Sequence, residues 1–412
     1  MFPARTISAV CLLALAHLRH ARALTISNVA VIDVNTGEVQ PPQNVIIEGN
    51  KIARMEQAGG EAAAGAADTI DGTGKFVMPG LCDMHVHAYF SNDPERFKVT
   101  DNFTFPLMIA NGVTCVRDLG SNLEAIKSGR DRIAAHQLDG PPRIFLTGPM
   151  LDGPNSTFQT ALQLNTPDEA RQAVRSLKDQ GVDYIKVHLK PSREVFDAIA
   201  EEAKAARMSF GGHVPDSITA QDAVDAGMNF IEHMSRTEAN DSKLIESVVE
   251  KKVWQCPTLK LNPAQERLDL TKMLFEAGAL MVAGTDSPAG KNLCPGVSLL
   301  DELELMHRAG LSQLQTLQAA TRNAADSVGM LSKMGTLETG KMADLVLLDE
   351  NPLEDIGNVR KIRAVVADGQ LYEREKLDEM LSRADKLVQC NRGGKLAARD
   401  LISAAPSCCS AH

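Results

Sequence analysis

The chain has 412 residues, which is more than one small domain needs and enough for a large barrel with an accessory module. Its hydrophobic content of 44% and charged content of 23% are those of an ordinary soluble globular protein. The formal net charge is −10 and only 4% of the residues are aromatic, which argues against nucleic acid or an anionic membrane as the main partner.

The first segment, residues 1–23, has the pattern of a secretory signal peptide. A basic start precedes an apolar run over residues 7–18, and Ala21–Ala23 resembles a cleavage site. Basic residues around 19–22 also suit an organelle presequence. We therefore predict a secreted or periplasmic protein, with an organelle or the cytoplasm as the alternative. The run is too short for a membrane span, and no later segment has the length and apolarity of one.

Short β-type runs at both flanks of the sequence predict one small domain. Runs within residues 24–77 are separated by turn residues such as Gly37 and Gly49. Similar runs return at Ala343–Leu348 and Ile362–Asp368. We expect segments 24–77 and 335–374 to pair into a β-sandwich, with the central domain inserted between them. Residues 375–412 are expected to form a C-terminal amphipathic helix and a loose tail.

Residues 78–334 alternate between apolar strand-like runs and amphipathic helical stretches. The expected strands are Leu81–His87, Val113–Asp118, Arg143–Gly148, Tyr184–His188, Ser209–His213, Asn229–His233, Trp254–Leu259 and Leu280–Asp286. Helical spacing is clearest in Pro167–Gln180 and Arg193–Arg207. Strands alternating with helices over about 250 residues predict an α/β fold of the TIM-barrel type. A doubly wound sheet is the alternative, but no G-x-G-x-x-G opens a helix here.

The eight cysteines do not have the pattern of a disulfide framework. Cys82 and Cys115 lie in apolar runs and are expected to be buried thiols. For Cys256 and Cys294 a structural role is favoured over metal ligation. Cys408 and Cys409 lie near the end of the chain, in a tail of C-a-a-X length. Its interior residues are not aliphatic and its last residue is His412, so prenylation is not expected.

Metal-competent side chains stand in the expected strands or at their ends. They are His85, His87, Lys186, His213, His233 and Asp286. Taken singly, a histidine at a strand end is more often a structural residue, and an aspartate before Ser-Pro is more often a helix N-cap. The carboxyl ends of barrel strands share one rim, however, so these residues are expected to meet there. Their joint occurrence predicts a metal centre.

The motifs around these residues resemble the amidohydrolase superfamily, in particular the imidazolonepropionase-like branch. That branch includes binuclear Xaa-Pro-type dipeptidases and ochratoxin-hydrolysing amidases. The matching segments are Val77–His87, Asp183–Lys186, Gly212–His213, Ile231–His233, Gly284–Ser287 and Gly335–Val346. The resemblance covers about residues 24–374.

The resemblance implies two divalent metal ions, with zinc as the expected metal. Asp286 and the histidine pair of the first strand would hold the more buried ion, and His213 and His233 the second. Lys186 would carry a carbon dioxide-derived carbamate that bridges both ions. An ammonium group has no lone pair to donate, whereas burial among cations frees an amine that reacts with carbon dioxide. Relatives with one metal and no bridging lysine, such as deaminases, are the alternative.

The activity implied by the resemblance is hydrolysis of an amide bond. A metal-bridging hydroxide attacks the carbonyl carbon, and Asp286 moves the proton to the leaving nitrogen. The favoured substrate is a dipeptide or N-acyl amino acid, including ochratoxin-like amides. Cyclic amides, lactones or esters, or deamination, are the alternative on the same site. A non-catalytic metal-binding barrel protein is the alternative of another class. The resemblance also suggests a homo-oligomer.

Three further residues are candidates for substrate contacts. His188 follows Lys186 by two positions and therefore faces the same side of its strand. Tyr89 follows the first histidine pair, and Arg117 ends the second run, where a guanidinium could hold a substrate carboxylate. A loop-anchoring hydrogen bond is an equally good interpretation of each.

Overall fold

The structure is a computed structural model that describes residues 23–59, 68–289 and 292–393. The signal-peptide prediction for residues 1–23, the tail and the cysteine pair at 408 and 409 lie essentially outside the described residues. Among the described helices, none combines the length and the apolar character needed to cross a bilayer.

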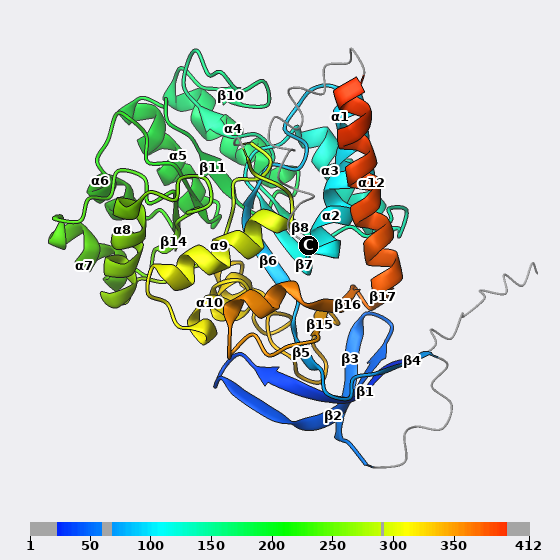
Figure 1. Ribbon diagram of the computed structural model, residues 1–412. Coiled ribbons are helices and arrows are strands. Elements are labelled where there is room, and N and C mark those ends of the chain that lie inside the picture. Colours follow the sequence, from blue (N-terminus) through cyan, green and yellow to red (C-terminus); the bar gives the residue numbers. More distant parts are fainter. Residues whose placement is uncertain (1–22, 60–67, 290–291, 394–412) are drawn as a thin grey trace, which may run out of the picture.

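One mixed sheet is built from both flanks of the chain (Figure 1). Its strands, in spatial order, are β17 (Gln370–Glu373), β16 (Ile362–Ala367), β15 (Leu345–Leu348), β5 (Phe76–Pro79), β1 (Leu24–Asp33), β2 (Glu38–Glu48) and β3 (Lys51–Gln57). A further strand, β4 (Asp68–Asp71), also pairs with β1. The flanks meet where β5 runs antiparallel to β15, with Val77 opposite Leu347. Apolar side chains from both flanks, including Ile26, Val45 and Leu345, share one buried cluster.

The strands between these flanks are parallel and form two further sheets. The first contains β6 (Leu81–Val86), β7 (Val113–Asp118) and β8 (Arg143–Leu146). The second contains β10 (Leu162–Gln163), β9 (Leu151–Asp152), β11 (Ile185–Val187), β12 (Phe210–Gly212), β13 (Phe230–Glu232) and β14 (Trp254–Cys256). Apart from the exposed β10, most residues of these parallel strands are buried, as is usual for strands covered on both faces, which explains their continuous apolar runs.

Each expected strand of the central region contains an observed strand except the last, and that prediction is wrong. Residues 280–287 make only isolated parallel bridges, from Met281 to Gln255 and from Ser287 to Val86. Asp286 has a φ of 67°, a left-handed conformation that interrupts extended pairing. The segment still lies between β14 and β6, because its backbone bridges to both.

Helices connect and flank the parallel strands (Figure 1). They are α1 (Pro94–Val99), the π-helix η1 (Thr100–Thr104), α2 (Phe105–Ala110), α3 (Leu123–Ala134), α4 (Pro167–Asp179), α5 (Arg193–Ala205), α6 (Ala220–Asp225), α7 (Ser242–Glu250), α8 (Gln265–Glu276), α9 (Val297–Arg308), α10 (Gln313–Ala319), α11 (Arg322–Ser327), the 3₁₀-helix η2 (Ile356–Arg360) and α12 (Arg374–Gly393). The side chains of Thr166 and Ser192 cap α4 and α5 at the expected positions. The predicted C-terminal helix is confirmed as α12, which packs against α2.

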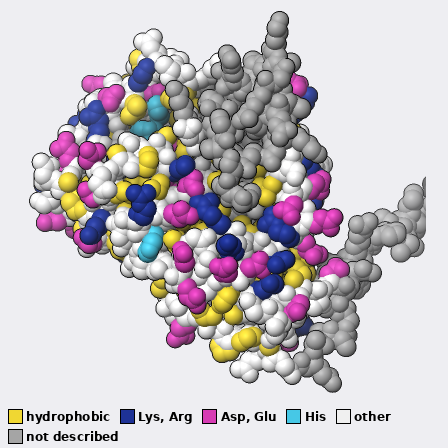
Figure 2. All heavy atoms as spheres, viewed as in Figure 1, with side chains coloured by type: hydrophobic (Ala, Val, Ile, Leu, Met, Phe, Trp, Pro, Cys, Tyr) yellow, Lys and Arg dark blue, Asp and Glu magenta, His cyan; other side chains and the backbone are white. Residues whose placement is uncertain are grey.

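An ion-pair cluster joins the mixed sheet to the parallel strands. The guanidinium of Arg143, in β8, lies 3.4 Å from Asp344 and 3.0 Å from Asp368. Burial raises the pKa of Asp344, and the positive charge of Arg143 opposes that rise. Figure 2 shows acidic and basic side chains interspersed over the visible face.

Replacing Arg143 with Ala should destabilise the fold in a pH-dependent way. The change leaves Asp344 buried without its cation, at a cost of about 1–3 kcal/mol. A carboxyl group whose folded pKa is raised prefers its protonated form, so the loss should grow as pH rises from about 4 to 7. Thermal unfolding across this range measures the effect. The exposed Arg54→Ala variant is the control and should cost about 0–1 kcal/mol, whereas an equal, pH-independent loss in both would contradict the assignment.

Candidate metal centre

Histidine side chains from the ends of four parallel strands lie side by side. The ring centroids of His87 and His85 are 5.3 Å apart, and those of His85 and His233 are 4.7 Å apart. The row continues from His233 to His213 at 4.6 Å and from His213 to His188 at 4.5 Å. Residues distant in the sequence thus meet because each follows or ends a strand of the parallel sheets.

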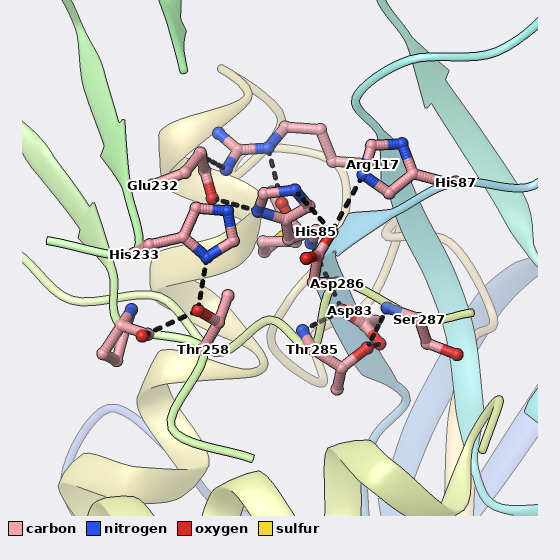
Figure 3. Close-up of polar contacts among 12 residues, drawn as sticks. Asp83, His85, His87, Arg117, Glu232, His233, Thr258, Thr285, Asp286 and Ser287 are labelled. Carbon is pink, nitrogen blue, oxygen red and sulfur yellow. Dashed lines mark hydrogen bonds and ion pairs between the residues drawn. The ribbon is translucent and has the colours of Figure 1, made fainter. Parts of the chain in front are cut away.

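Asp286 faces the first histidine pair (Figure 3). Its Oδ1 atom lies 2.9 Å from His87 Nε2 and 3.2 Å from His85 Nε2. The three ligand atoms lie within 4.8 Å of one another, a spacing that can hold a metal ion. Burial opposes ionisation of Asp286, but the two histidines outweigh it and hold the pKa of this carboxyl well below its usual range.

Buried donor atoms without hydrogen-bond partners mark the rest of the centre. They include Lys186 Nζ and His213 Nδ1. Such atoms are rare in folded proteins and call for a specific explanation. Burial lowers the pKa of Lys186 to about 8, and burial together with the charge of Lys186 lowers that of His213. Neutral imidazoles and a readily deprotonated amine are donors that fit a divalent cation.

A glycine makes room for the lysine. Gly212 has a φ of +131°, and a Cβ atom there would lie 2.7 Å from Lys186 Cδ. The same Cβ atom would lie 2.3 Å from the carbonyl oxygen of Val187, so a larger residue would displace the strand. Glycine at this position therefore lets β12 pass close to the buried lysine side chain.

Glu232 orients His85 from the side opposite Asp286. His85 Nδ1 lies 2.7 Å from Glu232 Oε2, and this contact orients the ring so that Nε2 points towards Asp286. Arg117 donates to Glu232 Oε1 at 2.5 Å and to the Met84 carbonyl at 2.7 Å. Burial opposes the charge on Glu232, but Arg117 and His85 keep its pKa below the usual value. Glu232 is thus an anion enclosed between two cationic or donor groups.

Two further histidines are oriented through their Nδ1 atoms. His87 Nδ1 lies 3.2 Å from the Gly120 carbonyl, and His188 Nδ1 lies 3.0 Å from Asp152 Oδ2. Asp152 also accepts the backbone N–H of Lys190 at 2.8 Å, which fixes the carboxylate. Fixing a histidine ring through one nitrogen while the other faces the centre is the usual arrangement around a bound metal.

His233 is held by a strained loop. Its Nδ1 atom lies 2.7 Å from the hydroxyl of Thr258, which donates to the Pro257 carbonyl at 2.8 Å. His233 has a φ of 58° and Thr258 a φ of 48°. The left-handed region is unfavourable for a β-branched residue, and such strain often accompanies a functional site.

Asp83 fixes the segment that carries Asp286. It accepts the backbone N–H of Thr285 at 3.0 Å and the Thr285 hydroxyl at 2.6 Å (Figure 3). Burial raises the pKa of Asp83 to about 7. These bonds tie the irregular segment after residue 280 to β6, where a regular strand was expected.

Two expected substrate contacts are corrected. Arg117 is 1% exposed and its guanidinium is engaged by Glu232 and Met84, so it does not reach a substrate carboxylate. Tyr89 is 1% exposed, and its hydroxyl donates at 2.6 Å to Asp101, a residue of η1. Both residues make anchoring hydrogen bonds, which was the alternative interpretation of each from the sequence. His188, in contrast, lies in the histidine row.

The cysteines play structural parts. Cys82, Cys115 and Cys256 are free thiols in the interior, as expected. Cys256 lies within ligand distance of His85 and Glu232, but burial raises its pKa well above the usual value, which favours the thiol over the metal-binding thiolate. Cys294 is disulfide-bonded.

Sequence reasoning missed the residues that orient the ligands. Glu232 directly precedes His233 in a matched motif, so its position was visible although its role was not. Asp152 ends the short strand β9, which the sequence analysis did not anticipate. No sequence signal distinguishes Thr258 from other loop threonines.

Comparison with known proteins places this geometry among related enzymes. The model of the amidohydrolase family matches residues 76–372. Ochratoxinase of Aspergillus niger is 29% identical over 234 residues, 48% of this chain and 47% of that protein, so the chain spans about half the length of this curated relative. Imidazolonepropionase of Rubrobacter xylanophilus is 23% identical over 77% of this chain and 87% of that protein. The crystal structure of a Xaa-Pro dipeptidase with bound methionine in the active site is 25% identical, with a TM-score of 0.73, covering 85% of this chain and 100% of that one.

Replacing Glu232 with Gln should weaken metal binding about 10–100-fold, because the amide no longer provides two anionic acceptors for His85 and Arg117. Competition of the variant with a chromophoric zinc chelator measures this change. The control variant, Glu238→Gln, makes the same substitution at an exposed position away from the centre. It should bind zinc like the parent protein. Equal zinc affinity in all three proteins would remove Glu232 from the role assigned to it.

Proposed function

Because the chain belongs to the amidohydrolase family, we propose that it is a metal-dependent hydrolase of an amide bond. The observation that carries the proposal is the meeting of the histidine row with Asp286 and the unpaired amine of Lys186. A structural role does not account for so many buried, unpartnered donor atoms at one place.

Two zinc ions are the proposed cofactor. His85, His87 and Asp286 would hold one ion, and His213 and His233 the other. Lys186 would attack carbon dioxide with its free amine, form an N–C bond and release a proton, which leaves a carbamate as the shared ligand. When bound, divalent ions lower the pKa of water and polarise a substrate carbonyl.

Asp286 is the proposed acid–base group. Its side chain is 15% exposed, whereas that of His85 is fully buried, so the carboxylate lies on the accessible side of the centre. It would take a proton from the attacking water as the new C–O bond forms. The same proton would pass to the departing nitrogen as the C–N bond breaks.

The proposed substrate is a dipeptide or an N-acyl amino acid. Similarity to a Xaa-Pro dipeptidase and to ochratoxinase supports an acyclic amide. The second candidate is a cyclic amide of the imidazolone kind, favoured by the longer match to imidazolonepropionase. Substrate choice resides in loops around a shared centre, so fold alone does not decide between them.

The proposal extends to the architecture and location of the protein. A closed eight-stranded barrel is supported by backbone bonds from Asp183 to Leu146 at 2.8 Å and from Met84 to Ala283 at 2.9 Å, which join neighbouring parallel segments. The mixed sheet would fold as a β-sandwich beside it. Secretion is supported by the N-terminal sequence pattern. A homo-oligomer remains part of the proposal.

Metal analysis combined with an amide panel tests the function. We expect two zinc equivalents per chain, loss of hydrolysis after dialysis against a chelator, and recovery when zinc is returned. Native mass spectrometry should show the added mass of one carbon dioxide on the loaded protein and not on a Lys186→Met variant. Metal binding without hydrolysis of any dipeptide, N-acyl amino acid or cyclic amide would favour a non-catalytic protein.

The Asp286→Asn variant should lower kcat about 10²–10⁴-fold and change KM much less, since it removes proton transfer. Zinc content measured on the same sample separates this loss from loss of metal. Asp216→Asn, at an exposed aspartate paired with Arg236, is the control and should retain activity. Near-normal turnover by the Asp286 variant at full zinc content would overturn the assigned role.

A further inference from the structure

Two phenylalanine rings connect the ends of the histidine row. The Phe90 ring lies 4.7 Å from that of His87, and the Phe158 ring lies 4.9 Å from that of His188. The two phenylalanines are 5.3 Å apart, with an angle of 43° between their planes. With the histidine contacts already described, they complete a closed ring of aromatic side chains.

The phenylalanine pair is the accessible part of this ring. Phe90 and Phe158 are each partly exposed, whereas His87 and His188 are 5% and 7% exposed. Neither phenylalanine belongs to a hydrophobic cluster formed by the described residues. Their apolar surface therefore adds little to the core, and its place beside the ligands calls for another explanation.

The rings are carried by two loops that are tied together. Phe90 lies between β6 and α1, and Phe158 between β9 and β10. Asn92 Nδ2 donates to the Gln159 carbonyl at 3.1 Å and joins the two loops. Asn122 Nδ2 donates to Asn92 Oδ1 at 2.9 Å and fixes the linking side chain. The aromatic pair is thus held in position by polar contacts rather than by burial.

From this arrangement we propose that Phe90 and Phe158 form a subsite for an aromatic group that the substrate carries beside the scissile amide. The inference rests on the proposed function and names the substrate class within it. Tilted and edge-to-face contacts are the favoured geometry between aromatic rings, and a third ring can join an existing pair in this way. Such contacts are worth about 3–10-fold in binding beyond burial of the same area.

Matched substrates and variants test the subsite. The zinc-loaded full chain is assayed with Phe-Ala and Ala-Phe against Leu-Ala and Ala-Leu, which differ only in the aromatic ring at each position. The parent protein should prefer phenylalanine over leucine about 3–10-fold in kcat/KM at one of the two positions. Phe158→Leu should abolish that preference, because it should lower kcat/KM for the phenylalanine substrate more than for the leucine substrate, whereas Phe158→Tyr should keep the preference.

Phe275→Leu is the matched control, because Phe275 is a partly exposed phenylalanine of α8 that packs against the core. It should keep the parent preference. An equal loss on phenylalanine and leucine substrates in Phe158→Leu, or no aromatic preference in the parent, would overturn the subsite while leaving the proposed function intact. If no amide is hydrolysed, the proposed function fails. Calorimetry then compares the binding of N-acetyl-phenylalanine amide with that of N-acetyl-leucine amide. Tighter binding of the phenylalanine compound by about 3–10-fold, lost in Phe158→Leu, supports the subsite, and equal binding by the parent protein overturns it.

Discussion

The buried carboxylate of Glu232 is the constraint on which the centre depends. A charge this deep in the protein is unfavourable unless donors surround it, and here Arg117 and His85 supply them. Arg117 in turn reaches back to the Met84 carbonyl and lies 4.4 Å from the centre of the Phe230 ring. One network therefore joins β6, β7 and β13 and sets the direction of a metal-facing nitrogen. The carboxylate that these donors stabilise in turn orients the His85 ring.

Residues in strained backbone conformations position other side chains of the centre. His233, Thr258 and Asp286 all have positive φ values, and all lie where a strand ends or fails to continue. Left-handed residues turn their side chains away from the regular alternation of a strand. The hydrogen bonds of Asp83 and Thr258 hold these conformations in place. Regular pairing and local strain together bring donors from distant segments to one point.

The sequence indicated which histidines lie together, but not which residues orient them. His85, His213 and His233 were recognisable because apolar runs end at or beside them, and the end of a parallel strand fixes where a side chain goes. The roles of Arg117 and Tyr89 were not recognisable, because a polar residue at a strand end can face the rim or the interior. Burial decides between these directions, and burial depends on packing that one sequence does not show.

The same limit explains the errors in the fold. Most parallel strands were predictable, because each is a continuous apolar run flanked by segments with the residue spacing of amphipathic helices. The last expected run has the composition of a strand, yet its end is diverted by Asp286 and its contacts with Asp83. The short strands β9 and β10 lack a run long enough to predict, although β9 ends in Asp152, which orients His188.

The mixed sheet gives this chain a particular order of assembly. β5 has β1 on one side and β15 on the other, and more than half of the sequence separates these two neighbours. During synthesis, β1 to β5 emerge first and expose an unpaired edge until β15 leaves the ribosome. The mixed sheet can thus be completed only after almost all of the residues between β5 and β15 have been made. Nascent chains halted before β15 should therefore be the forms most prone to aggregate and most dependent on chaperones.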